Sequence, residues 1–196
     1  MTTIIAVTKN QSLGKIHKAI QLGQKTFGEN YLQDALPKIQ YFNSHYSDLE
    51  WHFIGQVQSN KTRDIATYFS WVQSVDNSKI AERLNNQRPE HLPPLQICIE
   101  INNSQQPQKP GISLKNLPLL ITTLKTLPRL QWRGLMTTIT EEYEIVAQTF
   151  HELKKHGYNI DTLSMGMSND YLDALRLGAT LIRIGTAFFG KREGSK

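Results

Sequence analysis

The chain has 196 residues, of which 39% are hydrophobic and 20% charged, and this is the composition of one ordinary globular domain. We therefore expect a single domain over residues 1–196. Cys98 is the only cysteine, which excludes an internal disulfide and favours a reducing compartment, so we expect a cytoplasmic protein. No apolar run approaches the ~20 residues of a membrane span. The opening residues MTTIIAVTK also lack the features of an export signal, so we expect no membrane partner.

The formal net charge of +5 raises the question of nucleic-acid binding. The basic residues are scattered, and even the densest pairs, such as Lys15/Lys18 and Lys154-Lys155, do not alternate with aromatic residues as a single-strand platform would. We expect no nucleic-acid partner and interpret the charge as a mildly basic, solvated surface. Such a surface favours a phosphorylated small molecule over a neutral one.

Short apolar runs alternate with amphipathic segments from one end of the chain to the other. Repeated alternation predicts parallel strands joined by helical crossovers, and eight strands predict closure into a single (β/α)8 TIM barrel. An open doubly wound sheet is the alternative, although no GxGxxG follows a strand. The eight predicted strands are Thr3–Thr8, Lys25–Gly28, Trp51–Gly55, Trp71–Val75, Leu95–Asn102, Gln131–Met136, Thr162–Ser164 and Thr180–Ile184.

The segments between the strands predict seven helices. Ser12 stands before the first of them as a predicted N-cap, and Pro37 lies inside the second, where it predicts a kink or a break. Residues 188–196 are short and basic and are not expected to pack as an eighth helix. The outward side chains of the first and last strands are therefore expected to lack a cover, namely Ile4, Ala6, Ile182 and Ile184.

Lys9 ends the first predicted strand. Alternation places Ile5, Val7 and Lys9 on one face, so this long amine follows two core residues toward the barrel interior. One interpretation is a lysine that extends from the strand end into water. The other is a Schiff-base lysine that bonds a carbonyl carbon at the mouth of the barrel.

Arg183 shares the inward face of the last predicted strand with Leu181. A buried guanidinium is costly unless it meets an acceptor. Spacing alone leaves two interpretations equally open: a structural salt bridge to Glu29 or Asp161, or a contact with a ligand.

Two neighbouring loops near the C-terminus have the character of an anion site. Ser164 to Asp170 joins a strand to a helix, with Gly166 allowing close backbone approach and Ser168 or Asp170 available as a cap. Gly185-Thr186 follows the next strand, and TIM barrels frequently bind phosphate with the loops after strands seven and eight. Each loop alone fits an ordinary capped turn, but together beside Arg183 they predict a phosphate site.

Other chemistries find no support in the sequence. The six histidines lack the spacing of metal ligands, and neither a Ser/His/Asp order nor a GxSxG elbow occurs, so we expect no metal.

Seven motifs in order carry a resemblance to a known family. They are Ala6-Val-Thr-Lys9, Phe27-Gly-Glu-Asn-Tyr31, Trp51 to Lys61, Ser74-Val-Asp76, Arg133-Gly-Leu-Met136, Leu163 to Ser168, and Leu181-Ile-Arg-Ile-Gly-Thr186. Over nearly its whole length the chain resembles the pyridoxal phosphate homeostasis protein family, also called the proline synthetase co-transcribed homologue family. That resemblance implies a barrel similar to the N-terminal domain of alanine racemase.

The resemblance also implies a cofactor, pyridoxal 5′-phosphate (PLP), bound covalently at Lys9 through a Schiff base. It implies that Arg183 faces the pyridine nitrogen and that Asn30 lies near the ring. The phosphate is then expected at Ser164, Met165, Ser168, Gly185 and Thr186. The family is associated with PLP supply, so PLP-dependent apo-enzymes are the expected recipients, and a monomer or a weak homodimer is the expected state.

The chain departs from the family pattern at two places. Gln11 replaces a second lysine of the first motif, which leaves Lys109 as the matching family lysine that could relay PLP. Family members also carry a helix before the first strand, which this chain is expected to lack.

We expect a carrier without catalytic turnover. Fold-related racemases use a second base from an additional β domain, whereas this chain ends at Lys196. Arg183 at the ring nitrogen makes the ring a poorer electron sink than a carboxylate partner would. The alternative, a PLP-dependent amino-acid racemase or lyase, needs a second acid–base residue at the mouth, for which His52 and Tyr31 are the candidates.

Overall fold

The computed structural model describes residues 2–104 and 110–190, which form a closed barrel of eight parallel strands in chain order. Closure confirms the predicted (β/α)8 fold and excludes the open sheet. The strands are β1 (Thr3–Val7), β2 (Thr26–Glu29), β3 (Glu50–Phe53), β4 (Trp71–Val75), β5 (Leu95–Glu100), β6 (Leu130–Met136), β7 (Thr162–Ser164) and β8 (Leu181–Ile184).

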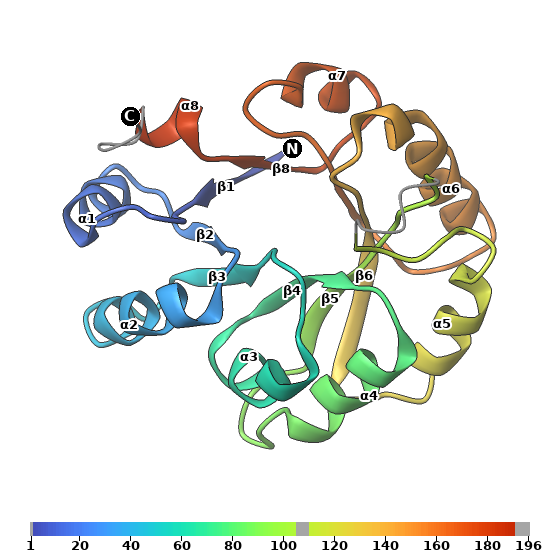
Figure 1. Cartoon of the computed structure of the whole chain (residues 1–196), viewed down its shortest axis with the longest axis horizontal. Coiled ribbons are helices and arrows are strands. Elements are labelled where there is room, and N and C mark those ends of the chain that lie inside the picture. Colours follow the sequence, from blue (N-terminus) through green and yellow to red (C-terminus); the bar gives the residue numbers. More distant parts are fainter. Residues whose placement is uncertain (1, 105–109, 191–196) are drawn as a thin grey trace.

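Helices surround the ring of strands (Figure 1). The α-helices are α1 (Leu13–Gln21), α2 (Leu32–Asn43), α3 (Thr62–Tyr68), α4 (Ser78–Gln87), α5 (Leu117–Leu124), α6 (Tyr143–Lys155), α7 (Tyr171–Arg176) and α8 (Thr186–Phe189). Two 3₁₀ turns, η1 (Ser59–Lys61) and η2 (Thr140–Glu142), precede α3 and α6.

Three local expectations about the helices have different outcomes. Ser12 caps α1 as predicted, because its hydroxyl accepts a hydrogen bond from the Lys15 N–H at 3.4 Å. Pro37 does not break α2, which continues over 12 residues with five of them buried against the barrel. The seven helices predicted between the strands are present, but the expectation that none follows the last strand is wrong, since Thr186–Phe189 forms a one-turn helix there.

The barrel closes where β1 pairs with β8. Ile4 lies opposite Ile182 and Ile5 opposite Arg183, so the two ends of the chain share one register. This pairing places the end of β1, which leads to Lys9, beside the end of β8, which leads to Gly185.

The outer face of this closing pair is covered at three of its four positions and open at Ile4. Ile182 and Ile184 are buried in one hydrophobic cluster with Ala174 of α7, and the partly buried Phe189 of α8 packs against that cluster, so the expectation that β8 lacks a cover is wrong. Ala6 is also fully buried. Ile4 retains 44% of its exposure and is the uncovered position of the four.

Alanine substitutions at these paired positions should differ in cost. Ile182→Ala should lower the free energy of unfolding by about 2–4 kcal/mol, because a buried cavity forms. Ile4→Ala, its partner across the strands, should cost less than about 1 kcal/mol because the side chain is already half in water. Urea unfolding measures both, and equal losses would show that the outer face of β1 is covered in solution.

An ionisable side chain, Glu100, lies at the interior end of β5. It is 3% exposed. Burial raises the pKa of its carboxyl to about 7, with a further increase from Asp76 and an opposing effect of the Arg183 charge. The folded protein therefore binds a proton here that the unfolded chain loses near its ordinary pKa of 4.5.

Glu100 should therefore lower the free energy of unfolding as pH rises from about 4.5 to about 7. Above about pH 7 its contribution should change little. Glu100→Gln remains neutral and should remove the loss. Urea unfolding of both proteins at pH 5 and pH 8 is the measurement. The stability gained by the substitution should be greater at pH 8, by roughly 2 kcal/mol, and an equal effect at both pH values would contradict the raised pKa.

Candidate functional site

A hollow of about 550 Å³ opens at the carboxyl ends of the strands. This volume is within the range of about 300–1,000 Å³ that small-molecule sites have. Six of the predicted site residues line it: Lys9, Asn30, Ser168, Arg183, Gly185 and Thr186. The other lining residues are Val7, Gln11, Ile54, Thr138, Met167, Asn169 and Asp170.

Lys9 lies in a tight turn directly after β1. The Gln11 N–H bonds the Thr8 carbonyl at 3.0 Å, and Asn10 adopts a left-handed φ of 58°, which asparagine tolerates better than most residues. The Lys9 amine lies 3.5 Å from the Tyr31 hydroxyl and 4.7 Å from the centre of its ring. The lysine thus lies against a wall of the hollow, where a ligand could reach it.

A buried ion pair fixes the strand end beneath Lys9. The Lys38 amine donates to Glu29 Oε1 at 2.7 Å and to the Thr8 carbonyl at 2.8 Å, and the Thr8 hydroxyl donates to the same carboxylate oxygen at 2.6 Å. Burial raises the pKa of Glu29, and the Lys38 and Thr8 contacts oppose that effect. Because Thr8 precedes Lys9, this cluster holds the turn in place.

Asn30 owes its position to a close approach of two loops. Gly55, after β3, lies so near that a Cβ on it would be 2.0 Å from the Asn30 carbonyl oxygen. Only glycine allows this contact, which sets the backbone of Asn30 at the rim of the hollow.

Arg183 is enclosed in the barrel interior at 4% exposure. Its Nη1 donates to Ser164 Oγ at 2.5 Å, and its Nη2 donates to the Thr137 carbonyl at 2.8 Å. The predicted salt-bridge alternative is wrong, because Glu29 pairs with Lys38 and Asp161 pairs with Arg133. Desolvation lowers the pKa of Arg183, yet arginine keeps its charge.

The loop from β7 to α7 is shaped for close packing. Gly166 has a φ of 97°, and a Cβ there would lie 2.7 Å from the Ala174 Cβ. Asp170 Oδ1 accepts from the Met167 N–H at 2.6 Å and from the Tyr143 hydroxyl at 3.0 Å. The loop is therefore fixed by α6 as well as by its own turn.

Ser168 connects this loop to the segment after β8. Its hydroxyl accepts from the Ala187 N–H at 3.5 Å, at the start of α8. Asp170 is the N-cap residue of α7, although its side chain makes no capping hydrogen bond there. The two loops predicted to form an anion site thus meet through Ser168.

Two predicted phosphate residues do not line the hollow. Ser164 is fully buried, and its hydroxyl donates to Gln73 Oε1 at 2.6 Å while it accepts from Arg183. Met165 is also fully buried. The sequence placed Ser164 at the end of a strand but could not name Gln73 as its partner, 91 residues away.

Sequence reasoning missed Tyr143 as part of the site and did not predict the contact of Thr137 with Arg183. Tyr143 lies in α6, and its hydroxyl accepts the Gly166 N–H at 3.0 Å. Thr137 supplies a backbone carbonyl to Arg183. Neither residue has a local motif that announces the contact, because both reach it from other elements.

His52 is not at the mouth of the barrel. It lines a hollow of about 380 Å³ with Thr3, Thr180 and Leu181, where strands begin and not where they end. Of the two acid–base candidates, only Tyr31 lies beside Lys9. Lys109 lies outside the described residues.

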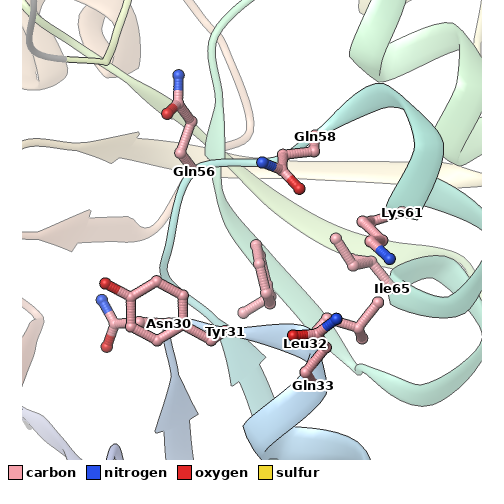
Figure 2. Close-up of a pocket in the computed structure, with 9 residues that line it drawn as sticks. Asn30, Tyr31, Leu32, Gln33, Gln56, Gln58, Lys61 and Ile65 are labelled. Atoms are coloured by element: carbon pink, nitrogen blue, oxygen red, sulfur yellow. The ribbon is translucent and has the colours of Figure 1, made fainter.

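A second hollow of about 340 Å³ lies on the other side of Asn30, which lines both. Figure 2 shows Tyr31 and Lys61 on opposite sides of it. It is lined by both polar and apolar side chains, namely Asn30, Tyr31, Leu32, Gln33, Phe53, Gln56, Gln58, Lys61 and Ile65.

Within the described residues, no group of three or more His, Cys, Asp or Glu side chains could hold a metal ion. No helix in those same residues has the length and apolar character needed to cross a membrane.

The chain is similar to known proteins over nearly its whole length. The family described as alanine racemase, N-terminal domain, matches residues 1–193. The pyridoxal phosphate homeostasis protein of Escherichia coli (strain K12) is 46% identical over 99% of this chain and 87% of its own length. That of Pseudomonas aeruginosa is 46% identical over 97% of this chain and 84% of its own length.

Solved structures agree with this similarity. PipY of Synechococcus elongatus PCC7942, solved with PLP bound, has a TM-score of 0.87 and 32% identity over 96% of this chain and 92% of its own. Alanine racemase from Corynebacterium glutamicum shares the fold alone, with a TM-score of 0.72 and 17% identity over 99% of this chain and 57% of its own. The chain therefore belongs to the pyridoxal phosphate homeostasis protein family and has the fold of the alanine racemase N-terminal domain.

Proposed function

We propose that this chain binds PLP covalently at Lys9 and carries or buffers it within the cell, as part of PLP homeostasis. The lining of the 550 Å³ hollow supports this proposal most directly. It combines a lysine amine, a buried guanidinium and two loops suited to an anion. The names of the relatives and the PLP bound to PipY support the same cofactor.

The residues present fit each part of PLP. When bound, PLP supplies an aldehyde carbon that bonds an amine with loss of water, and Lys9 provides that amine. Arg183 has five N–H donors, of which hydrogen bonds to the described residues use two, so donors remain for the ring nitrogen. Ser168, Gly185 and Thr186 would hold the phosphate, and Asn30 would lie beside the ring.

We propose that Ser164 positions Arg183 and does not contact the phosphate, because its buried hydroxyl accepts a hydrogen bond from the guanidinium. Met165, fully buried beside it, would support the loop and not touch the phosphate directly. These assignments refine the five phosphate residues that the resemblance implies.

The residues around the hollow favour binding of PLP without catalytic turnover of a substrate. A guanidinium donates to the ring nitrogen and cannot protonate it, so little negative charge can be stored in the ring. Asp170, the carboxylate that lines the hollow, is already bonded to Met167 and Tyr143. Tyr31 remains as an acid–base group for the racemase or lyase alternative, because its hydroxyl lies beside the Lys9 amine.

The cellular part of the proposal follows from this chemistry. A carrier would release PLP in the cytoplasm to PLP-dependent apo-enzymes, as a monomer or a weak homodimer. Gln11 lines the hollow where a second lysine would allow transfer between amines. Release would then proceed by addition of water, which reverses the attachment, or by transfer to an amine of the recipient.

Covalent attachment can be tested by borohydride reduction. PLP added to the protein should give a yellow complex, and reduction should fix the cofactor to the peptide that contains Lys9, as identified by mass spectrometry. Lys9→Ala should lose both signals because no other amine lines the hollow among the described residues. Lys61→Ala, which removes a lysine from the neighbouring hollow, is the control and should keep both. The same labelled peptide from Lys9→Ala would disprove the attachment site.

Turnover can be tested separately on the PLP-bound protein. Racemisation, transamination and decarboxylation of the common amino acids should not exceed the rate of free PLP, because Arg183 limits charge storage in the ring. Chiral chromatography and product analysis measure these rates. A saturable rate that Tyr31→Phe abolishes, with PLP still bound, would establish the enzyme alternative instead.

A further inference from the structure

A continuous chain of buried hydrogen bonds runs from Arg183 through the barrel interior. Arg183 Nη1 contacts Ser164 Oγ at 2.5 Å, and Ser164 Oγ contacts Gln73 Oε1 at 2.6 Å. Gln73 Nε2 then lies 2.9 Å from His52 Nδ1, and His52 Nε2 lies 2.8 Å from Glu50 Oε1. Ser164 and Gln73 are fully buried, and His52 is 1% exposed.

The directions of these hydrogen bonds follow from two conditions: Arg183 can only donate, and the Ser164 hydroxyl hydrogen needs an acceptor. Arg183 can only donate, so Ser164 Oγ accepts from it and turns its own hydrogen toward Gln73. Gln73 therefore presents its amide oxygen to Ser164 and its NH₂ group to His52. His52 Nδ1 must accept, which leaves the hydrogen on Nε2, where it donates to Glu50.

The end of the hydrogen-bond chain that is farther from Arg183, at His52 and Glu50, lies at the opposite mouth of the barrel. His52 stacks on Trp71, with ring centres 4.9 Å apart. The Arg133 guanidinium carbon lies over the Trp71 ring, 4.9 Å from its centre. Glu50 is 46% exposed, so the chain ends in contact with solvent. Burial lowers the pKa of His52, and the Glu50 contact opposes that effect.

Protonation of His52 would conflict with the rest of the chain. A hydrogen on Nδ1 would face the Gln73 NH₂ group, and two donors cannot bond each other. Rotating the Gln73 amide would relieve that conflict but would turn its NH₂ toward Ser164, whose hydrogen would then lose its acceptor. A neutral His52 is the form compatible with all the bonds at once.

We propose that Ser164, Gln73 and His52 are positioning residues that hold the Arg183 guanidinium in the orientation in which it meets the cofactor ring. This proposal rests on the proposed function, because it assigns to Arg183 a ligand in the 550 Å³ hollow. Arg183 has two anchors, the Thr137 carbonyl and the Ser164 hydroxyl. The hydroxyl is the anchor whose orientation depends on side chains elsewhere in the interior.

Matched substitutions of buried hydroxyls test the proposal. Ser164→Ala removes the link between Arg183 and Gln73, whereas Thr62→Val removes a buried hydroxyl that bonds Ser59 and Gln87 on the outer side of the barrel. Ser164→Ala should raise the Kd for PLP about tenfold (~1.4 kcal/mol) and shift the absorption maximum of the complex. Thr62→Val should change neither, although urea unfolding should show a comparable loss of stability. Gln73→Leu, one bond further away, should have a smaller effect on Kd in the same direction.

Equal Kd values for PLP in Ser164→Ala and Thr62→Val would overturn the positioning role while leaving PLP binding by the unaltered protein intact. Failure of the unaltered protein to bind PLP would instead overturn the proposed function, so the two failures are distinguishable.

The donor and acceptor roles along these hydrogen bonds can be tested without a variant and without PLP. Nitrogen-15 NMR of the histidines at pH 7 should show His52 as the neutral tautomer with its hydrogen on Nε2. A hydrogen on Nδ1 would disprove the bond directions and with them the link from His52 to Arg183.

Discussion

Pairing of the first strand with the last is the constraint on which the site depends. Residues Thr3–Ala6 pair with Leu181–Ile184, and this joins two segments that lie more than 170 positions apart in the chain. Lys9 follows one of these strands, and Gly185 and Thr186 follow the other. Without closure, the Lys9 amine and the loops after β7 and β8 would belong to different parts of an open sheet. The hollow is thus a product of the seam that completes the barrel.

A second constraint is the cost of enclosing a guanidinium among β-branched side chains. Burial of an unpaired charge is strongly unfavourable, so the surrounding strands must supply acceptors. They do so with neutral groups, a hydroxyl from β7 and a backbone carbonyl after β6. A carboxylate at this point would neutralise Arg183 internally. Neutral acceptors leave its charge available to a ligand, which is why the electrostatics of the hollow favour an anionic or electron-rich partner.

The chain shares its fold with alanine racemase. In this chain the barrel brings Lys9, Gly185 and Thr186 to one hollow. The proposed carrier function depends on the restraint on the groups near that hollow. Asp170 is bonded within its loop, and Tyr31 lies against the lysine that would hold the cofactor. Affinity for PLP needs the amine and the phosphate loops, whereas turnover also needs a free acid–base group.

The sequence by itself determined the alternation of strands and helices, the inward faces of Lys9 and Arg183, and the two loops that meet the hollow. Each of these follows from a local period or a local turn, which a single segment contains. Only the tertiary structure decided which acceptors Arg183 meets, that His52 lies at the opposite mouth, and that Ser164 bonds Gln73. It also added α8 and left α2 unbroken at Pro37. The reason is physical: a two-residue period gives the face of a strand, but the depth of a side chain along the barrel and its partners across it depend on the register between strands that are distant in sequence.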